Sequence, residues 1–195
     1  MNAADADRSR LLQLLIELSY AEREVTLSSG QKSNFYIDCK QAVLTGEGHA
    51  LVGRAFLRML MAAERGTNVV HAAVGGLTMG ADPLSSALAL TAHLGGRDLT
   101  AIYVRKEAKG HGTGAYLEGT KSVPAGARVA VLEDVVTTGN ASVTAIERLR
   151  SGGFVVDTVL AIVDREAGGR EALAKLGCAL HAVFTVADFP IGSKR

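Results

Sequence analysis

The sequence predicts an α/β fold in which helices flank a mostly parallel sheet of five strands. Five short apolar runs, mostly β-branched and with little polar alternation, are typical of strands buried on both faces of a sheet. Segments with helical periodicity lie between several of these runs. Strands and helices in alternation form βαβ units with right-handed crossovers, which make the strands parallel.

The predicted elements follow one another in a simple order. An N-terminal helix is indicated by four leucines that share one helical face, namely Leu11, Leu14, Leu15 and Leu18. Residues 26–38 are polar and turn-rich but end in a β-favouring run over residues 35–37, and a second helix follows over about residues 48–65. The five strands are predicted at residues 69–74, 99–104, 129–132, 154–163 and 182–186, with helices at about residues 84–94, 141–150 and 171–176.

Length, charge and cysteine content limit the class of protein. The 195 residues fit one domain, and 48% hydrophobic residues are enough to exclude intrinsic disorder. A net charge of +1 argues against non-specific binding to nucleic acid or to an anionic membrane. No apolar run approaches the roughly 20 residues of a membrane helix. Cys39 and Cys178 have neither disulfide nor metal spacing, so we expect a cytoplasmic protein with a single domain over residues 1–195.

The stretch that follows the strand at residues 129–132 carries the most specific signal. Glu133 and Asp134 stand side by side, and two apolar residues separate them from a polar loop that opens a helix. Hydroxyl groups, an amide and backbone N–H groups of this loop can converge on one anion, where the helix dipole also favours negative charge. The residues concerned are Thr137, Thr138, Gly139, Asn140 and Ser142. Because carboxylates repel phosphate, the acidic pair should face sugar hydroxyls or a hydrated cation, so the implied ligand is a sugar phosphate.

This stretch has a purely structural interpretation, and two nucleotide-binding motifs can be compared with it. The acidic pair can be an ordinary strand end and the loop an ordinary helix N-cap. A nucleotide-binding P-loop is excluded because the chain has no GxxxxGK[ST] pattern, and no G-x-G-x-x-G pattern follows a strand.

Residues 129–141 resemble the ribosyl-phosphate motif of the type I phosphoribosyltransferases, enzymes that use 5-phosphoribosyl 1-diphosphate (PRPP). The resemblance implies the fold of that family, with a small N-terminal hood built from about residues 20–45 and the C-terminal end. It implies that the acidic pair holds the ribose hydroxyls, with Asp134 also taking part in catalysis, and that the loop wraps the 5′-phosphate. The implied PRPP contacts are Glu133, Asp134, Val135, Val136, Thr137, Thr138, Gly139, Asn140 and Ala141.

A second strand end carries a dense run of potential cations, Arg105, Lys106, Lys109 and His111, with glycines that allow the segment to move. Taken alone, such a run is more typical of a solvated surface loop. It resembles the catalytic loop of the orotate phosphoribosyltransferases, here about residues 105–119. The resemblance implies that all four residues contact PRPP, that Lys109 is the one most tied to catalysis, and that residues 105–111 reach the neighbouring active site of a homodimer.

Weaker signals surround these two motifs. The glycine-rich segment after residue 74 is either a tight turn or, by the resemblance, a diphosphate loop with Thr78 and Met79 as PRPP contacts; many family members carry lysine where Met79 stands. Arg165 follows the strand at residues 154–163, where it can pair with a carboxylate or form an ordinary surface ion pair with Asp164. The resemblance implies orotate contacts at Arg165, Thr137, Tyr36 and Ile37, and a possible substrate contact at Lys32 in the hood.

The resemblance as a whole implies an orotate phosphoribosyltransferase. Such an enzyme transfers ribose 5-phosphate from PRPP to N1 of orotate in pyrimidine biosynthesis, with Mg²⁺ bound mainly through PRPP and not by dedicated protein ligands. A phosphoribosyltransferase for another base would share residues 133–142, but the basic loop and Arg165 argue against it. A non-catalytic PRPP-sensing regulator usually adds a DNA-binding helical unit, for which the residues before Thr26 are too few.

Overall fold

A computed structural model describes the chain except for residues 1, 27–31, 66, 68, 109–115 and 192–195. In the described residues the main sheet has the strand order β5-β4-β3-β6-β7-β8. Five of its strands are parallel: β3 (Ala73–Leu77), β4 (Thr100–Val104), β6 (Val129–Val136), β7 (Thr158–Asp164) and β8 (Ala179–Thr185). The predicted mostly parallel sheet is therefore confirmed, and the short β5 (Leu117–Glu118) adds an antiparallel edge strand beside β4.

Strand β3 differs most from its prediction, because it begins four residues later than expected and includes the glycines that were taken for a loop. Within the sheet Gly76 faces Leu132 of β6, and a Cβ at Gly76 would lie 2.2 Å from the Leu132 carbonyl oxygen. A Cβ at Gly75 would likewise lie 2.3 Å from the carbonyl oxygen of Ile102 in β4. The glycines thus let the neighbouring strands approach, which is a role inside a strand and not in a turn.

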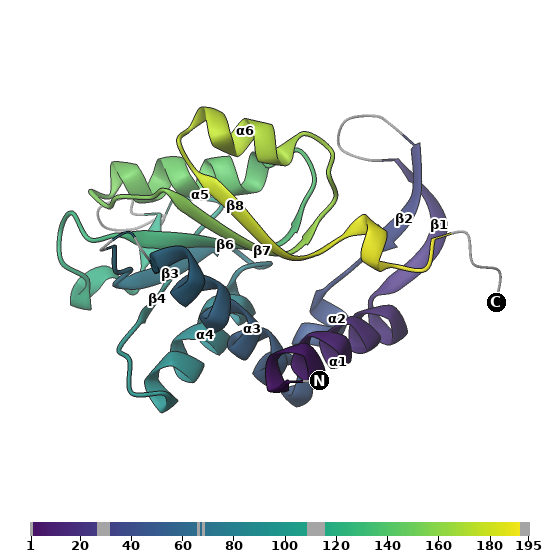
Figure 1. Ribbon diagram of the computed structural model, residues 1–195. Helices are drawn as coiled ribbons and strands as arrows, with labels where there is room; N and C mark the ends of the chain where they lie inside the picture. Colours follow the sequence, from purple (N-terminus) through teal and green to yellow (C-terminus); the bar gives the residue numbers. More distant parts are fainter. Residues whose placement is uncertain (1, 27–31, 66, 68, 109–115, 192–195) are drawn as a thin grey trace.

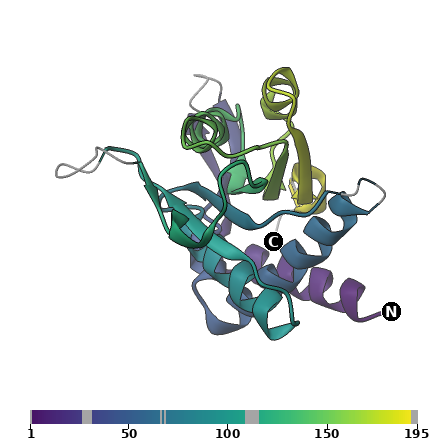
Figure 2. The ribbon, with the colours of Figure 1, turned by 90° about the vertical axis from the view of Figure 1, so that its left-hand side faces the viewer.

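Helices cover both faces of the sheet, as Figures 1 and 2 show. On one face α1, α3 and α4 pack on apolar side chains that include Val74 and Leu132, and on the other face α5 and α6 pack on a second cluster that includes Val131. The helices are α1 (Ala3–Leu18), α2 (Lys40–Val43), α3 (Gly46–Glu64), α4 (Asp82–Leu94), α5 (Asn140–Ser151) and α6 (Gly169–Lys175), with 3-10 turns η1 (Thr120–Ser122) and η2 (Val186–Asp188). None of the described helices is long and apolar enough to cross a membrane.

A separate antiparallel hairpin of β1 (Tyr20–Thr26) and β2 (Lys32–Ile37) stands beside the sheet (Figure 1). Aromatic rings attach it to the C-terminal segment: the ring centroid of Phe189 lies 5.5 Å from that of Tyr20 and 5.2 Å from that of Phe35. Strand β1 was not predicted, because its sequence is rich in charge and lacks an apolar run. Its strand conformation depends on pairing with β2, which the local sequence does not reveal.

The close contact between β3 and β6 gives a test of the fold. Replacing Gly76 with alanine should lower the free energy of unfolding by about 1–3 kcal/mol. The new methyl group would press on the Leu132 carbonyl oxygen, which is a backbone atom and cannot move aside as a flexible side chain could. The change is measured as a lower urea midpoint. Gly46→Ala is the control, since a Cβ there has no neighbour within 4 Å. Equal midpoints for Gly76→Ala and the wild type would contradict the role given to this glycine.

Candidate active site

A cavity of about 480 Å³ lies where the carboxyl ends of β3, β4 and β6 meet, and it gathers residues from four separate parts of the chain. Its lining comprises Lys40, Leu77, Thr78, Met79, Gly80, Lys106, Glu133, Asp134 and Ala141. Ligands of parallel α/β sheets bind at this edge. Six of the predicted PRPP contacts therefore lie around one cavity: Thr78, Met79, Lys106, Glu133, Asp134 and Ala141.

A second hollow of about 250 Å³ adjoins the first and is lined by Glu133 and by residues 135–142. Gly139 precedes α5 with a φ of +84°, a conformation that glycine adopts without the steric cost that a side chain would add. The helix therefore starts at Asn140, and the backbone N–H groups of its first turn have no helical partners. These groups and the helix dipole favour an anion at this hollow, as predicted for the phosphate loop.

Glu133 is buried in β6, with only 7% of its surface exposed. The Ser142 hydroxyl donates a hydrogen bond of 3.1 Å to Glu133 Oε2. Burial, together with repulsion from the adjacent Asp134 carboxylate, raises the pKa of Glu133 to about 8. Ser142 lines the smaller hollow, as expected for a residue of the anion loop, and its hydroxyl donates to the acidic pair. Hydroxyl donors from a ligand would favour the ionised form of Glu133.

Asp134 is held by the backbone and by a lysine that the sequence analysis missed. Its Oδ1 accepts from Val135 N at 2.8 Å, and Lys40 Nζ lies 3.8 Å from Oδ2. The same ammonium lies 2.7 Å from Asp38 Oδ1, and this contact raises the pKa of Lys40. Lys40 thus brings a cation from α2 to the acidic pair. A single lysine after the hood strand gives no signal that distinguishes it from a surface residue.

The predicted catalytic loop is described only at its two ends. Lys106 lines the larger cavity, whereas the Arg105 guanidinium lies 3.3 Å from Glu118 in β5. Lys109 and His111 lie outside the described residues. The structure therefore brings one of the four predicted basic residues to the cavity and directs a second toward the neighbouring strand.

Arg165 joins the end of β7 to the hood hairpin. Its Nη2 donates a hydrogen bond of 2.8 Å to the Phe35 carbonyl oxygen, and its guanidinium carbon lies 5.1 Å from the Phe35 ring centroid. Burial lowers the pKa of Arg165. The adjacent Asp164 pairs with Arg170 at 2.9 Å. Arg165 therefore stands between the sheet and the hood.

The other residues predicted to contact orotate lie in different parts of the structure. Thr137 lines the smaller hollow. The guanidinium of Arg23 lies 3.6 Å from the Tyr36 ring centroid, and Ile37 packs partly buried against the core. The ammonium of Lys32 lies 2.9 Å from Glu24 across the hairpin, and both side chains are exposed.

In the described part of the chain, no group of three or more His, Cys, Asp or Glu side chains is placed to hold a metal ion. Cys39 and Cys178 are buried free thiols.

A mostly parallel sheet with an acidic pair at a strand end, followed by an anion-binding turn at a helix N-terminus, defines the class of type I phosphoribosyltransferases. Comparison with known proteins narrows this class. No protein-family model matches the chain. The orotate phosphoribosyltransferase of Sorangium cellulosum is 47% identical over 190 residues, which cover 97% of this chain and 96% of that protein.

Solved structures agree with the sequence comparison. The Mycobacterium tuberculosis orotate phosphoribosyltransferase in complex with Fe(III) dicitrate matches with a TM-score of 0.78 at 39% identity, covering 95% of this chain and 99% of that one. The same enzyme in complex with PRPP matches with a TM-score of 0.73 at 37% identity, covering 93% and 98%. The chain belongs to the orotate phosphoribosyltransferase family.

The raised pKa of Glu133 predicts how stability depends on pH. The ordinary pKa is 4.5 and the folded value is about 8, so between these values the folded protein keeps a proton that the unfolded chain has released. Stability therefore falls as pH rises through this window. Glutamine does not titrate, so the melting temperature of Glu133→Gln minus that of the wild type should grow from pH 5 to pH 8.

Differential scanning calorimetry of the ligand-free protein measures this difference. Glu147→Gln, which changes an exposed acid on the neighbouring helix α5, is the control and should follow the wild type. A constant difference between Glu133→Gln and the wild type across the window would contradict the buried, protonated state.

Proposed function

We propose that this protein transfers ribose 5-phosphate from PRPP to N1 of orotate, giving orotidine 5′-monophosphate and diphosphate in the synthesis of UMP. One observation carries the proposal: the acidic pair lies at the boundary of two adjoining hollows, one an anion cradle and the other lined by Lys106 and by the turn at Thr78 and Met79. PRPP has the same order of groups, with a phosphate, a sugar and a diphosphate.

The shared lining of the two hollows supports one placement of PRPP. Both hollows are lined by Glu133 and Ala141, so the ribose belongs at this boundary. The 5′-phosphate then occupies the smaller hollow at the start of α5, and the diphosphate extends into the larger cavity toward Thr78 and Lys106. The PRPP complex of the Mycobacterium tuberculosis relative supports PRPP as the ligand.

The residues present suit displacement at ribose C1 through an oxocarbenium-like state. Glu133 and Asp134 accept from the ribose hydroxyls and oppose the positive charge that develops on the ring. Lys106, together with Arg105, Lys109 and His111 of the predicted loop, neutralises the charge that grows on the departing diphosphate, and such electrostatic stabilisation is usually the largest contribution to catalysis. Positioning the two substrates supplies the rest.

Mg²⁺ suits the same place, since it prefers carboxylate and phosphate oxygens and keeps several waters. Asp134 is partly exposed and lines the cavity proposed for the diphosphate. Its carboxylate could therefore contact a Mg²⁺ ion that is bound mainly through PRPP. Bound there, the ion supplies positive charge to the diphosphate oxygens. The chain's own part is to hold the ribose and to orient the leaving diphosphate.

The base and the assembly complete the proposal. Arg165 pairs with the orotate carboxylate, while the backbone at Tyr36 and Ile37, and Lys32, face the pyrimidine from the hood. Lys106 serves the cavity of its own chain, while the rest of the basic loop at residues 105–111 reaches the active site of a second copy in a homodimer. Two buried free thiols fit a reducing cytoplasm.

The loss of orotate absorbance in the presence of PRPP and Mg²⁺ tests the reaction. Among the bases tested with PRPP and Mg²⁺, only orotate should be consumed. Uracil, hypoxanthine and adenine should be left unchanged. Turnover of another base without loss of orotate would overturn the substrate assignment. Binding of PRPP without turnover of any base would favour the alternative function, a non-catalytic regulator that senses PRPP.

Lys109 gives the sharpest test of the basic loop. Lys109→Ala should lower kcat by roughly 100-fold, the effect expected when one preorganised donor to a developing charge is removed. The KM for PRPP should rise by a smaller factor. Lys121→Ala changes an exposed lysine in η1 and is the matched control, which should keep wild-type kinetics. An unchanged kcat in Lys109→Ala would remove this residue from the mechanism.

A further inference from the structure

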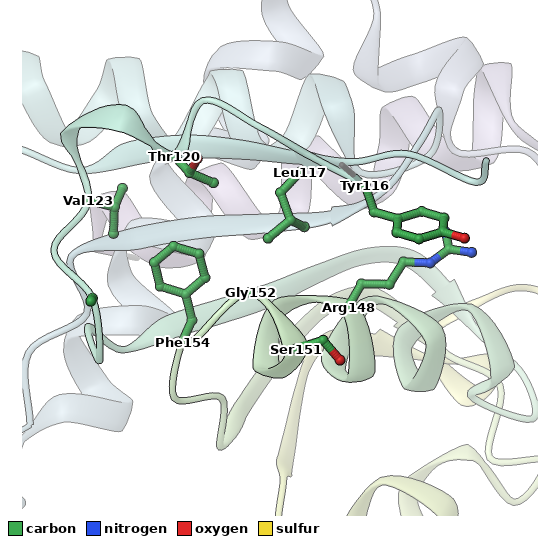
Figure 3. Close-up of a pocket in the computed structure, with 9 residues that line it drawn as sticks. Tyr116, Leu117, Thr120, Val123, Arg148, Ser151, Gly152 and Phe154 are labelled. Atoms are coloured by element: carbon green, nitrogen blue, oxygen red, sulfur yellow. The ribbon is translucent and has the colours of Figure 1, made fainter. Parts of the chain in front are cut away.

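One side chain from α5 contacts both ends of the predicted catalytic loop. Arg148 Nη1 donates to the Arg105 carbonyl oxygen, and Nη2 donates to the Lys106 carbonyl oxygen at 2.9 Å. The Tyr116 ring stacks on the same guanidinium, with the guanidinium carbon 4.2 Å from the ring centroid (Figure 3). Arg148 therefore links the first residues of the loop to a residue near its end.

The two ends of the loop also bind each other. Arg105 N donates a hydrogen bond of 2.8 Å to the Tyr116 carbonyl oxygen, and the Arg105 side chain lies 3.3 Å from Glu118. These contacts align the two segments as an antiparallel pair that extends β4 and β5. Arg148 connects this pair of segments to α5, a helix that covers one face of the sheet.

The same helix begins at the phosphate cradle. Asn140 opens α5 at the smaller hollow, and Arg148 lies eight residues further along, which is about 12 Å of helix rise. Ala145, Ile146 and Leu149 are buried against the sheet, so the helix is firmly seated between its two ends. One rigid element thus sets the distance between the proposed 5′-phosphate site and the backbone of Lys106.

Open space borders the guanidinium. Arg148 and Tyr116 line a pocket of about 460 Å³ that also touches Leu117 and Phe154 (Figure 3). Because the described residues leave this side without close packing, the orientation of Arg148 is set there by its two carbonyl contacts and by the ring. A planar guanidinium can serve two carbonyls and stack at the same time, which a lysine ammonium cannot do.

We propose that Arg148 is a positioning residue for the transfer reaction, which holds the backbone of Arg105 and Lys106 so that the Lys106 ammonium reaches the diphosphate. The proposal rests on the proposed function of the site. Arg148 itself lines neither of the two hollows assigned to PRPP. It acts through the residues whose carbonyl groups it binds.

Arg150 supplies a matched control on the same helix. Its Nη2 donates to the carbonyl oxygens of Val156 at 2.6 Å and Leu176 at 2.8 Å, far from the loop in sequence. Arg148→Gln and Arg150→Gln therefore each remove an arginine that donates to two backbone carbonyls. A loss of stability alone should affect the two variants alike.

Steady-state kinetics and melting temperatures of the wild type and the variants test the proposal. Arg148→Gln should lower kcat about tenfold and raise the KM for PRPP, while the KM for orotate stays within about twofold. Arg148→Lys should restore less than half of the lost kcat, and Arg150→Gln should keep the wild-type kcat. Wild-type kinetics in Arg148→Gln, equal losses in Arg148→Gln and Arg150→Gln, or an equal rise in both KM values would overturn the positioning role.

A failure of the proposed reaction gives a different pattern. If the wild type does not consume orotate, calorimetric titration with PRPP and Mg²⁺ takes the place of kinetics. Arg148→Gln should then weaken PRPP binding about tenfold, with Arg150→Gln unchanged. Equal affinities in the wild type and Arg148→Gln would overturn the positioning role.

Discussion

The constraint on which the rest of the site depends is a pair of neighbouring carboxyl groups near the end of the central strand β6, of which Glu133 is buried and Asp134 is partly exposed. Burial and repulsion from the neighbouring Asp134 carboxylate raise the pKa of Glu133 and so disfavour its ionisation. The structure offsets this cost with Ser142 from α5 on one carboxyl group and Lys40 from α2 near the other. Helices on different sides of the strand are thereby fixed with respect to the same pair.

The glycines of β3 make this arrangement possible. Strand β3 lies beside β6, and its backbone approaches the Leu132 carbonyl oxygen immediately before the acidic pair. The following turn brings Gly80 against Asp134, where a Cβ would lie 3.1 Å from Oδ1. Backbone therefore surrounds the carboxyl groups on this side, and the turn that carries Thr78 and Met79 is held next to them.

Local sequence predicted those parts of the fold and site that local chemistry determines. The buried strand at β6, the acidic pair and the helix start at Asn140 all follow within a dozen residues, so their pattern is visible in the chain. The start of β3 was misplaced because its glycines serve contacts between strands. Lys40 and Arg148 were missed because their partners lie 94 and 42–43 residues away along the chain, and neither stands in a distinctive pattern.

The hood rests on different supports from the sugar-phosphate half of the site. Its hairpin is attached by the rings of Tyr20, Phe35 and Phe189 and by the Arg165 contact to the Phe35 carbonyl oxygen, whereas the cradle and the acidic pair belong to β6 and α5. Substitutions in the hairpin can therefore reshape the proposed enclosure of the base without moving the groups proposed to bind the sugar. With such a division, related enzymes can differ in the base that accepts the ribose phosphate and still share one scaffold that binds PRPP.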